Sequence, residues 1–182
     1  DQITALFANE IPCTYIADGH HRAASAAKVR QALGEQSGPA ADYFLTTLFP
    51  SNQLAILDYN RVVKDLNGLT TAAFLTALEK DFTVKLVGAT AFKPSELHHF
   101  GLFIEGNWYQ LIAKPGTYTN DPIGVLDVTI LQNRVLDNIL SIKDPRTDVR
   151  VEFVGGIRGL SELEKKVNSG DFAAAFSLYP VT

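Results

Sequence analysis

The chain lacks methionine entirely and carries one cysteine, Cys13, in 182 residues. One cysteine cannot close a disulfide within the chain, which argues against a disulfide-stapled secreted scaffold and predicts a reducing, cytoplasmic location. No apolar run approaches the roughly 18 residues that span a bilayer, and no signal peptide opens the sequence, so we expect no membrane partner. Because the chain starts at Asp1 and contains no methionine, we also expect it to be a piece of a longer protein.

Positive charge is scarce as well. The 16 basic residues are outnumbered by 20 acidic ones, which gives a net charge of -4 and no surface-wide attraction for a nucleic acid backbone. The eleven phenylalanines and six tyrosines are spread over apolar segments rather than interleaved with lysine and arginine. That distribution favours a hydrophobic core over a base-stacking surface, so the sequence argues against nucleic acid as a partner.

Neither repeats nor low-complexity linkers interrupt the chain, which predicts a single domain over 1–182, with a motif-bearing part at 1–66 and an additional α+β part at 67–182. Short β-like runs alternate with amphipathic helical runs, without the long rhythm of a doubly wound sheet. This pattern predicts an α+β fold with a mixed, mostly antiparallel sheet and packed helices. Expected strands are 13–16, 43–49 and 55–63 (the last two as a hairpin), 82–87, 100–104, 108–113, 149–154 and 173–179; expected helices are 21–33, 70–80, 126–140 and 161–167.

The richest polar segment is Tyr15-Ile16-Ala17-Asp18-Gly19-His20-His21-Arg22, at the junction of an expected strand and an expected helix. The first amides of a helix have no internal acceptor, and the helix dipole leaves positive partial charge there, so an oxyanion is stabilised. Gly19 allows close backbone approach, and Arg22 can add a bidentate contact. The segment therefore predicts a phosphate or nucleotide site formed by Gly19, His20, His21 and Arg22.

Asp18 would repel a phosphate unless a cation or a proton lies between them. Its expected catalytic role is a magnesium ligand or a base for an attacking hydroxyl. Capping of the helix by its carboxylate is the simpler alternative.

The adjacent histidines His20 and His21 are a weak metal signal, because neighbouring side chains point in different directions on a strand or a helix. With one cysteine in the chain, a structural zinc site is disfavoured. We expect the two imidazoles to contact phosphate, to transfer a proton or to fix the loop. The second pair, His98-His99, has no glycine or arginine beside it and is interpreted as surface or packing.

Three further places carry candidate binding residues. The Gly155–Gly159 turn is expected between a strand and a helix, and its Gly156, Arg158 and Gly159 either form a second anion site or make a plain turn. Asn60 and Arg61 interrupt an apolar strand, either as substrate contacts or in an edge-strand or ion-pair role. Arg146, in a charged loop, either reaches a substrate anion or pairs within the loop.

The run Ile16–Arg22 resembles the signature of an uncharacterised bacterial and archaeal family, domain-of-unknown-function family 1015. The resemblance extends over essentially the whole chain, through Asp58–Val63, Asp144–Asp148 and Gly155–Leu160. It implies that the chain corresponds to the C-terminal portion of that family's members.

More remotely, Gly19-His20-His21-Arg22 is similar to the nucleotide-phosphate box of the ParB and sulfiredoxin superfamily, which includes a DNA-segregation CTPase, a sulfinic-acid reductase and free-serine kinases. His20 stands where sulfiredoxin has its reactive cysteine and where the CTPase has an acidic residue, so the free-serine kinases are the most similar. This resemblance implies that Asp18 assists the substrate hydroxyl or the metal and that the box holds the transferring phosphate. It also implies a further carboxylate upstream, either Glu10 or a residue before the chain.

From the motif and the resemblance we expect nucleotide-dependent phosphoryl transfer on a small-molecule substrate, by a serine kinase-like phosphotransferase or a phosphoserine phosphatase. The expected cofactors are Mg²⁺, with Asp18 as its ligand, and a nucleotide, ATP or ADP. The alternative is a non-catalytic module that senses a nucleotide or phosphate or binds a partner.

Overall fold

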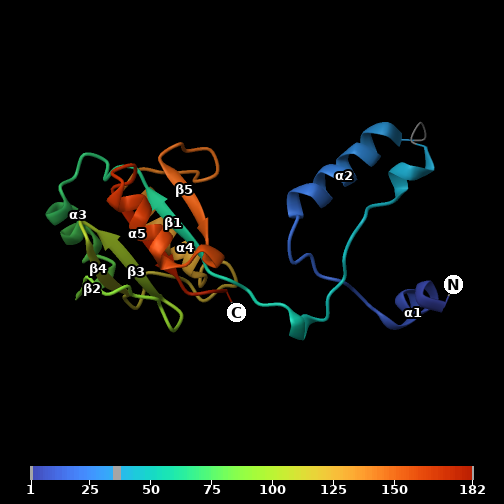
Figure 1. Ribbon diagram of the computed structural model, residues 1–182, viewed down its shortest axis with the longest axis horizontal. Helices are drawn as coiled ribbons and strands as arrows, with labels where there is room; N and C mark the ends of the chain where they lie inside the picture. Colours follow the sequence, from blue (N-terminus) through green and yellow to red (C-terminus); the bar gives the residue numbers. More distant parts are fainter. Residues whose placement is uncertain (1, 35–37, 182) are drawn as a thin grey trace. The chain divides into compact units, whose positions relative to one another are not determined.

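The computed structural model describes residues 2–34 and 38–181 (Figure 1). Contacts between its elements divide the chain into two compact units, residues 1–54 and residues 55–182. The single-domain organisation inferred from the sequence stays a prediction, and each unit is described here by itself.

The first unit is built from helices and extended chain. Helix α1 spans Gln2–Glu10 and helix α2 spans His20–Leu33, followed by the 3₁₀ turns η2 (Pro39–Asp42) and η3 (Ser51–Gln53). The alanine-rich α2 begins after Gly19 and ends before Gly34, close to the expected bounds, because a glycine at either end accommodates a positive φ. No described residue of this unit is buried, so these helices cover no core of their own.

Two strands expected in this unit are wrong. Residues 13–16 and 43–49 form no strand, and the hairpin between 43–49 and 55–63 is absent from the described residues. The backbone of 43–49 makes no ladder with another described segment, and an apolar run becomes a strand only where a neighbour supplies hydrogen bonds. Cys13, expected on a buried strand, is exposed. The junction before α2 is therefore a loop leading into a helix.

The second unit contains a six-stranded sheet in the order β2-β4-β3-β6-β1-β5. Its strands are β1 (Tyr59–Val63), β2 (Phe82–Gly88), β3 (His99–Ile104), β4 (Asn107–Ala113), β5 (Val151–Gly155) and β6 (Ala174–Leu178). Every pairing is antiparallel, which confirms the α+β class and makes the sheet antiparallel throughout rather than mixed. A turn at 105–107 joins β3 to β4, with Glu105 and Gly106 both at positive φ.

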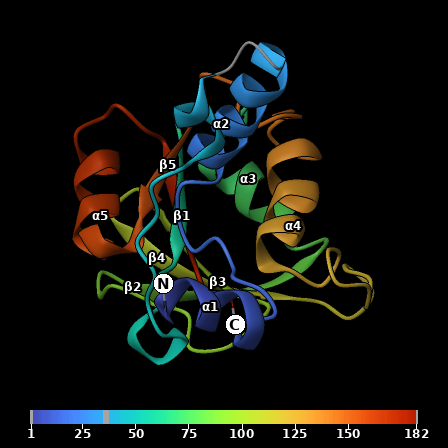
Figure 2. The ribbon, with the colours of Figure 1, turned by 90° about the vertical axis from the view of Figure 1, so that its right-hand side faces the viewer.

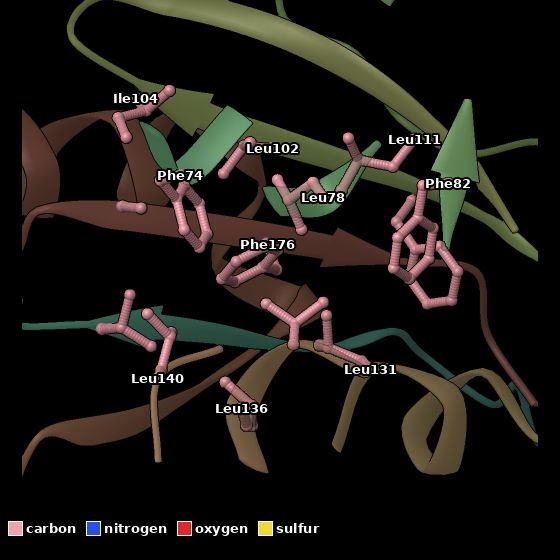
Figure 3. Packing of buried hydrophobic residues seen from close by; sticks show 14 of the residues in the cluster. Phe74, Leu78, Phe82, Leu102, Ile104, Leu111, Leu131, Leu136, Leu140 and Phe176 are labelled. Atoms are coloured by element: carbon pink, nitrogen blue, oxygen red, sulfur yellow. The ribbon is translucent and has the colours of Figure 1, made fainter. Parts of the chain in front are cut away.

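Helices cover both faces of the sheet, and α5 and α4 lie on opposite sides of β1 (Figure 2). Helix α3 (Thr71–Leu78) and helix α4 (Asp127–Leu131) cover one face, and α5 (Leu160–Asn168) covers the other. Figure 3 shows the larger core, formed with the first face by Phe74, Leu78, Phe82, Leu102, Ile104, Leu111, Leu131, Leu136, Leu140 and Phe176. The smaller core packs Leu163 and Val167 of α5 against Trp108 and Phe103.

The helices of this unit follow the sequence pattern with one difference. Thr70 caps α3, its Oγ1 accepting a hydrogen bond from the Ala73 amide at 3.2 Å. The expected helix at 126–140 is α4 followed by a π-helical turn, η4 (Gln132–Asp137). Across residues 2–34 and 38–181, no helix is both long and apolar enough to cross a membrane.

Candidate functional site

Asp18, Gly19, His20, His21 and Arg22 line a hollow of about 460 Å³ at the start of α2. Gly19 is the N-cap residue, with φ 84° and ψ 25°, a left-handed conformation that favours glycine. A side chain at Gly19 would place its Cβ 2.9 Å from Arg22 Nη2, so glycine also leaves room for the guanidinium. The structure thus brings the five predicted residues together at one helix end.

The first amides of α2 keep their hydrogen-bonding capacity. No side chain of the described residues caps this helix end, and the first amide of the helix that has an acceptor among the described residues is that of Ala23, which donates to Gly19 O at 2.9 Å. Capping by the Asp18 carboxylate, the simpler alternative, is not what the structure has. The amides of His20, His21 and Arg22 therefore face solvent at the positive end of the helix dipole.

Asp18 instead pairs with Arg22, whose Nη2 donates to Asp18 Oδ2 at 3.1 Å. The Asp18 side chain is 93% exposed and that of Arg22 is 74% exposed. An exposed pair one helical turn apart contributes little stability, so a ligand can separate the two charges at little cost. The pair neutralises the turn when no ligand is bound.

The side chains of this turn could bind a magnesium ion only together with ligands from outside the protein. No group of three or more His, Cys, Asp or Glu side chains within the described residues is arranged to hold a metal ion. Mg²⁺, however, is commonly bound through one or two carboxylates together with substrate phosphates and water. Asp18 fits that requirement as a single carboxylate beside a candidate anion site, whereas a protein-only metal centre does not fit.

The second predicted anion site lies on the turn between β5 and α5, where η5 spans Gly156–Arg158. The Gly156 amide donates to Asp58 O at 2.7 Å, and a Cβ on Gly156 would lie 2.5 Å from Asp58 Oδ1. Arg158 pairs with Glu162 at 3.8 Å, and Gly159 N bonds back to Gly156 O at 3.0 Å. An anion at this turn would be repelled by the Asp58 carboxylate. The absence of a side chain at Gly156 also lets the turn pack closely against Asp58.

Asn60 is buried completely and belongs to a polar network. Its Nδ2 donates to Asp58 Oδ2 at 2.7 Å, and its Oδ1 accepts from the Leu178 amide at 3.0 Å. Asp58, 4% exposed, also pairs with Lys93 Nζ at 3.2 Å. With both ends of its amide engaged, Asn60 ties β1 to β6. Sequence reasoning missed Lys93, because nothing local links it to a carboxylate 35 residues away in the chain.

The two remaining candidates differ in their surroundings. Arg146 donates to its neighbour Asp144 from Nε at 2.9 Å and from Nη2 at 3.1 Å, and this hydrogen bonding raises the pKa of Arg146 and lowers that of Asp144. The loop thus pairs internally, the second of the two expected readings. Arg61 lies beside the rings of Tyr59 and Phe153, two aromatic residues that the sequence pattern had not assigned to any site.

Comparison with known proteins shows the family of the chain. The family model described as "Protein of unknown function (DUF1015)" matches residues 1–129, which includes α2 and its N-terminal turn and extends to α4. The resembling segments at 144–148 and 155–160 lie outside the matched range. No curated protein and no solved structure matches the chain, and the similarity to the ParB and sulfiredoxin superfamily stays a prediction. The chain belongs to the DUF1015 family.

Proposed function

We propose that the turn Asp18–Arg22 binds the phosphates of a nucleotide and that the protein catalyses nucleotide-dependent phosphoryl transfer on a small metabolite, as a serine kinase-like phosphotransferase or a phosphoserine phosphatase. The observation that carries the proposal is the uncapped start of α2. Its free amides, the left-handed Gly19 and the side chains of His20, His21 and Arg22 gather in one hollow with a single carboxylate.

The roles follow from charge. The amides and Arg22 bind phosphate oxygens, which spread negative charge during transfer, and the imidazoles of His20 and His21 donate hydrogen bonds to the same oxygens. Asp18, released from Arg22 when phosphate binds, is then free to hold Mg²⁺ or to accept the proton of the substrate hydroxyl. Bound Mg²⁺ would neutralise phosphate charge and orient the transferring group.

The experiment is phosphorus NMR of the full-length protein with Mg²⁺, mixed in turn with L-serine and ATP, with L-serine and ADP, and with phosphoserine alone. The proposal expects a phosphoserine or inorganic phosphate signal that disappears in Asp18→Asn and falls by about a hundredfold or more in Arg22→Ala. Arg30→Ala is the matched control, since Arg30 lies at the other end of α2 and pairs with Asp42. Equal turnover in the Arg22 and Arg30 variants would contradict the site assignment.

A second candidate function is a non-catalytic module that senses a nucleotide or phosphate. The exposure of Asp18 and Arg22 favours it, because a site open to water suits binding more readily than transfer to a substrate. This module predicts that calorimetry detects nucleotide binding that Arg22→Ala abolishes, while no phosphorus signal changes over hours. Detectable turnover would eliminate it.

A further inference from the structure

Arg61 differs from the other arginines of residues 2–34 and 38–181. Each of the others has a carboxylate oxygen within 3.9 Å: Arg22, Arg30, Arg134, Arg146, Arg150 and Arg158. Arg61 has no such partner in the described part of the chain. An arginine that is partly removed from water without a counter-ion keeps a positive charge that no described carboxylate neutralises, so a further role for this side chain has to be considered.

Two aromatic rings hold the Arg61 guanidinium in place. Its Cζ lies 4.2 Å from the centre of the Phe153 ring and 5.0 Å from that of Tyr59, and these two rings stack at 5.3 Å with 15° between their planes. The side chain is half-buried, and burial lowers the pKa of Arg61 to about 10, although the group stays charged at neutral pH. The rings fix the direction of the cation without neutralising it.

The structure supports neither of the two structural roles expected for Arg61, that of an edge-strand residue and that of an ion-pair partner. It is not on an edge strand, since β1 pairs with β5 on one side and with β6 on the other. It forms no ion pair with a described residue, and the nearest carboxylate in the sequence, that of Asp58, bonds to Asn60 and Lys93. Because Asn60 and Arg61 are successive residues of a strand, they project to opposite faces, which places Asp58 away from the guanidinium.

The hydrogen bonds of Arg61 leave one side of its fork available. Nη1 donates to the carbonyl oxygens of Tyr59 and Asn60, whereas Nε and Nη2 have no acceptor among the described residues. Nε–H and Nη2–H point the same way in the plane of the guanidinium, at the spacing that matches two oxygens of a carboxylate or a phosphate. Tyr59, 54% exposed, leaves this corner of the sheet open to solvent.

We propose that Arg61, held against the stacked rings of Tyr59 and Phe153, is an oxyanion-binding site that accepts a phosphate or carboxylate group through Nε and Nη2. The site is built entirely from residues of the 55–182 unit, and it does not depend on the proposed activity of the Asp18–Arg22 turn. Arginine suits it because a lysine ammonium can neither present the fork nor stack on the two rings in the same way.

The test is an NMR titration of the full-length protein, labelled with ¹⁵N in its arginine side chains, with sodium phosphate and separately with sodium acetate at constant ionic strength. The Arg61 Nε–H signal should shift and saturate with a dissociation constant on the order of 1 mM, while the carboxylate-paired Arg146 signal stays in place. Saturation by phosphate alone, by acetate alone or by both supports the site and names its ligand class. A shift of Arg61 that does not saturate, or that only equals that of Arg146, would overturn it.

Variants separate this site from the helix site. In Arg61→Lys, the rise of the thermal unfolding midpoint with the effective anion should shrink to the background seen with sodium chloride. It should persist in Lys85→Gln, which removes one exposed charge on β2, and in Arg22→Gln, which disables the α2 site. If Arg61→Lys does not fold, the titration of the unmodified protein still decides. Loss of the response in Arg22→Gln but not in Arg61→Lys would refute the assignment to Arg61.

Discussion

Asp127 is a buried carboxylate that we expect to make stability depend on pH. It is the first residue of α4 and is 3% exposed. Its Oδ1 accepts a hydrogen bond from the His98 amide at 2.8 Å, whereas its Oδ2 is buried without a partner among the described residues. Burial raises the pKa of Asp127, against opposing effects of the His98 amide and of the charges of His98 and His99.

The sign follows from proton binding. Because the folded pKa lies above the unfolded value of about 3.9, the folded state binds more protons between those two values, and stability falls as pH rises through that window. Above the folded pKa, Asp127 is ionised in both states, and the loss of stability caused by burying its charge no longer changes with pH. An unpartnered buried polar atom costs about 1–3 kcal/mol, and more when it is charged. Asp127→Asn keeps an acceptor for the His98 amide and removes the charge, so it should abolish this pH dependence.

The assay is urea unfolding from about pH 4 to about pH 7, followed by the fluorescence of the single tryptophan, Trp108, which is fully buried. The difference between the free energies of unfolding of Asp127→Asn and of the unmodified protein should change in favour of Asp127→Asn as pH rises. Asp127→Ala, which strands the His98 amide, should be less stable than Asp127→Asn by about 1–3 kcal/mol. Asp171→Asn, on an exposed carboxylate, should track the unmodified protein. Parallel curves for Asp127→Asn and the unmodified protein would refute the reasoning.

Two further substitutions test local packing and capping in the same unit. Gly156→Ala should lower the free energy of unfolding by about 1–3 kcal/mol, because its Cβ would lie 2.5 Å from Asp58 Oδ1. Gly155→Ala should change it far less, because no atom lies within 4 Å of a Cβ at Gly155. Equal losses in urea unfolding would contradict the packing argument. Thr70→Ala should lower the free energy of unfolding by about 0.5–2 kcal/mol, because it removes the cap of α3. Thr70→Ser keeps a hydroxyl and should retain most of that stability. A serine variant as unstable as the alanine variant would show that capping is not the cause.

The sequence predicts the second unit well because its elements are specified locally. The hairpin of β3 and β4 consists of two largely apolar runs around a turn whose Gly106 tolerates a positive φ, and Thr70 precedes an apolar helical face. The order of the strands in the sheet, in contrast, is not specified locally. Strand β6 pairs with both β1 and β3 although it is the last strand in the chain. No local pattern encodes which distant strand completes a ladder, so the order comes only from the structure.

The wrong strands fail for the same physical reason. The run 43–49 has the β-branched and aromatic residues of a strand, yet β propensity expresses a fit to neighbouring strands, and 1–54 contains no described strand to pair with it. By contrast, the helix starting at His20 needs no distant partner for its backbone bonds. The candidate turn at Asp18–Arg22 was found because it is contiguous. The Arg61 site was found only in part, because Phe153 reaches it through the register of β1 with β5.

The two proposed anion sites make opposite demands on a ligand. At the start of α2, Asp18 occupies Arg22, so a bare oxyanion must displace one carboxylate and then lie beside it. A phosphate that arrives with a divalent cation avoids that repulsion, because the cation gives Asp18 a new partner. At Arg61 no carboxylate has to move, and the rings already hold the guanidinium, so less order is lost when an oxyanion binds. A metal-bound nucleotide therefore suits the helix turn, whereas a free phosphate or carboxylate group suits Arg61.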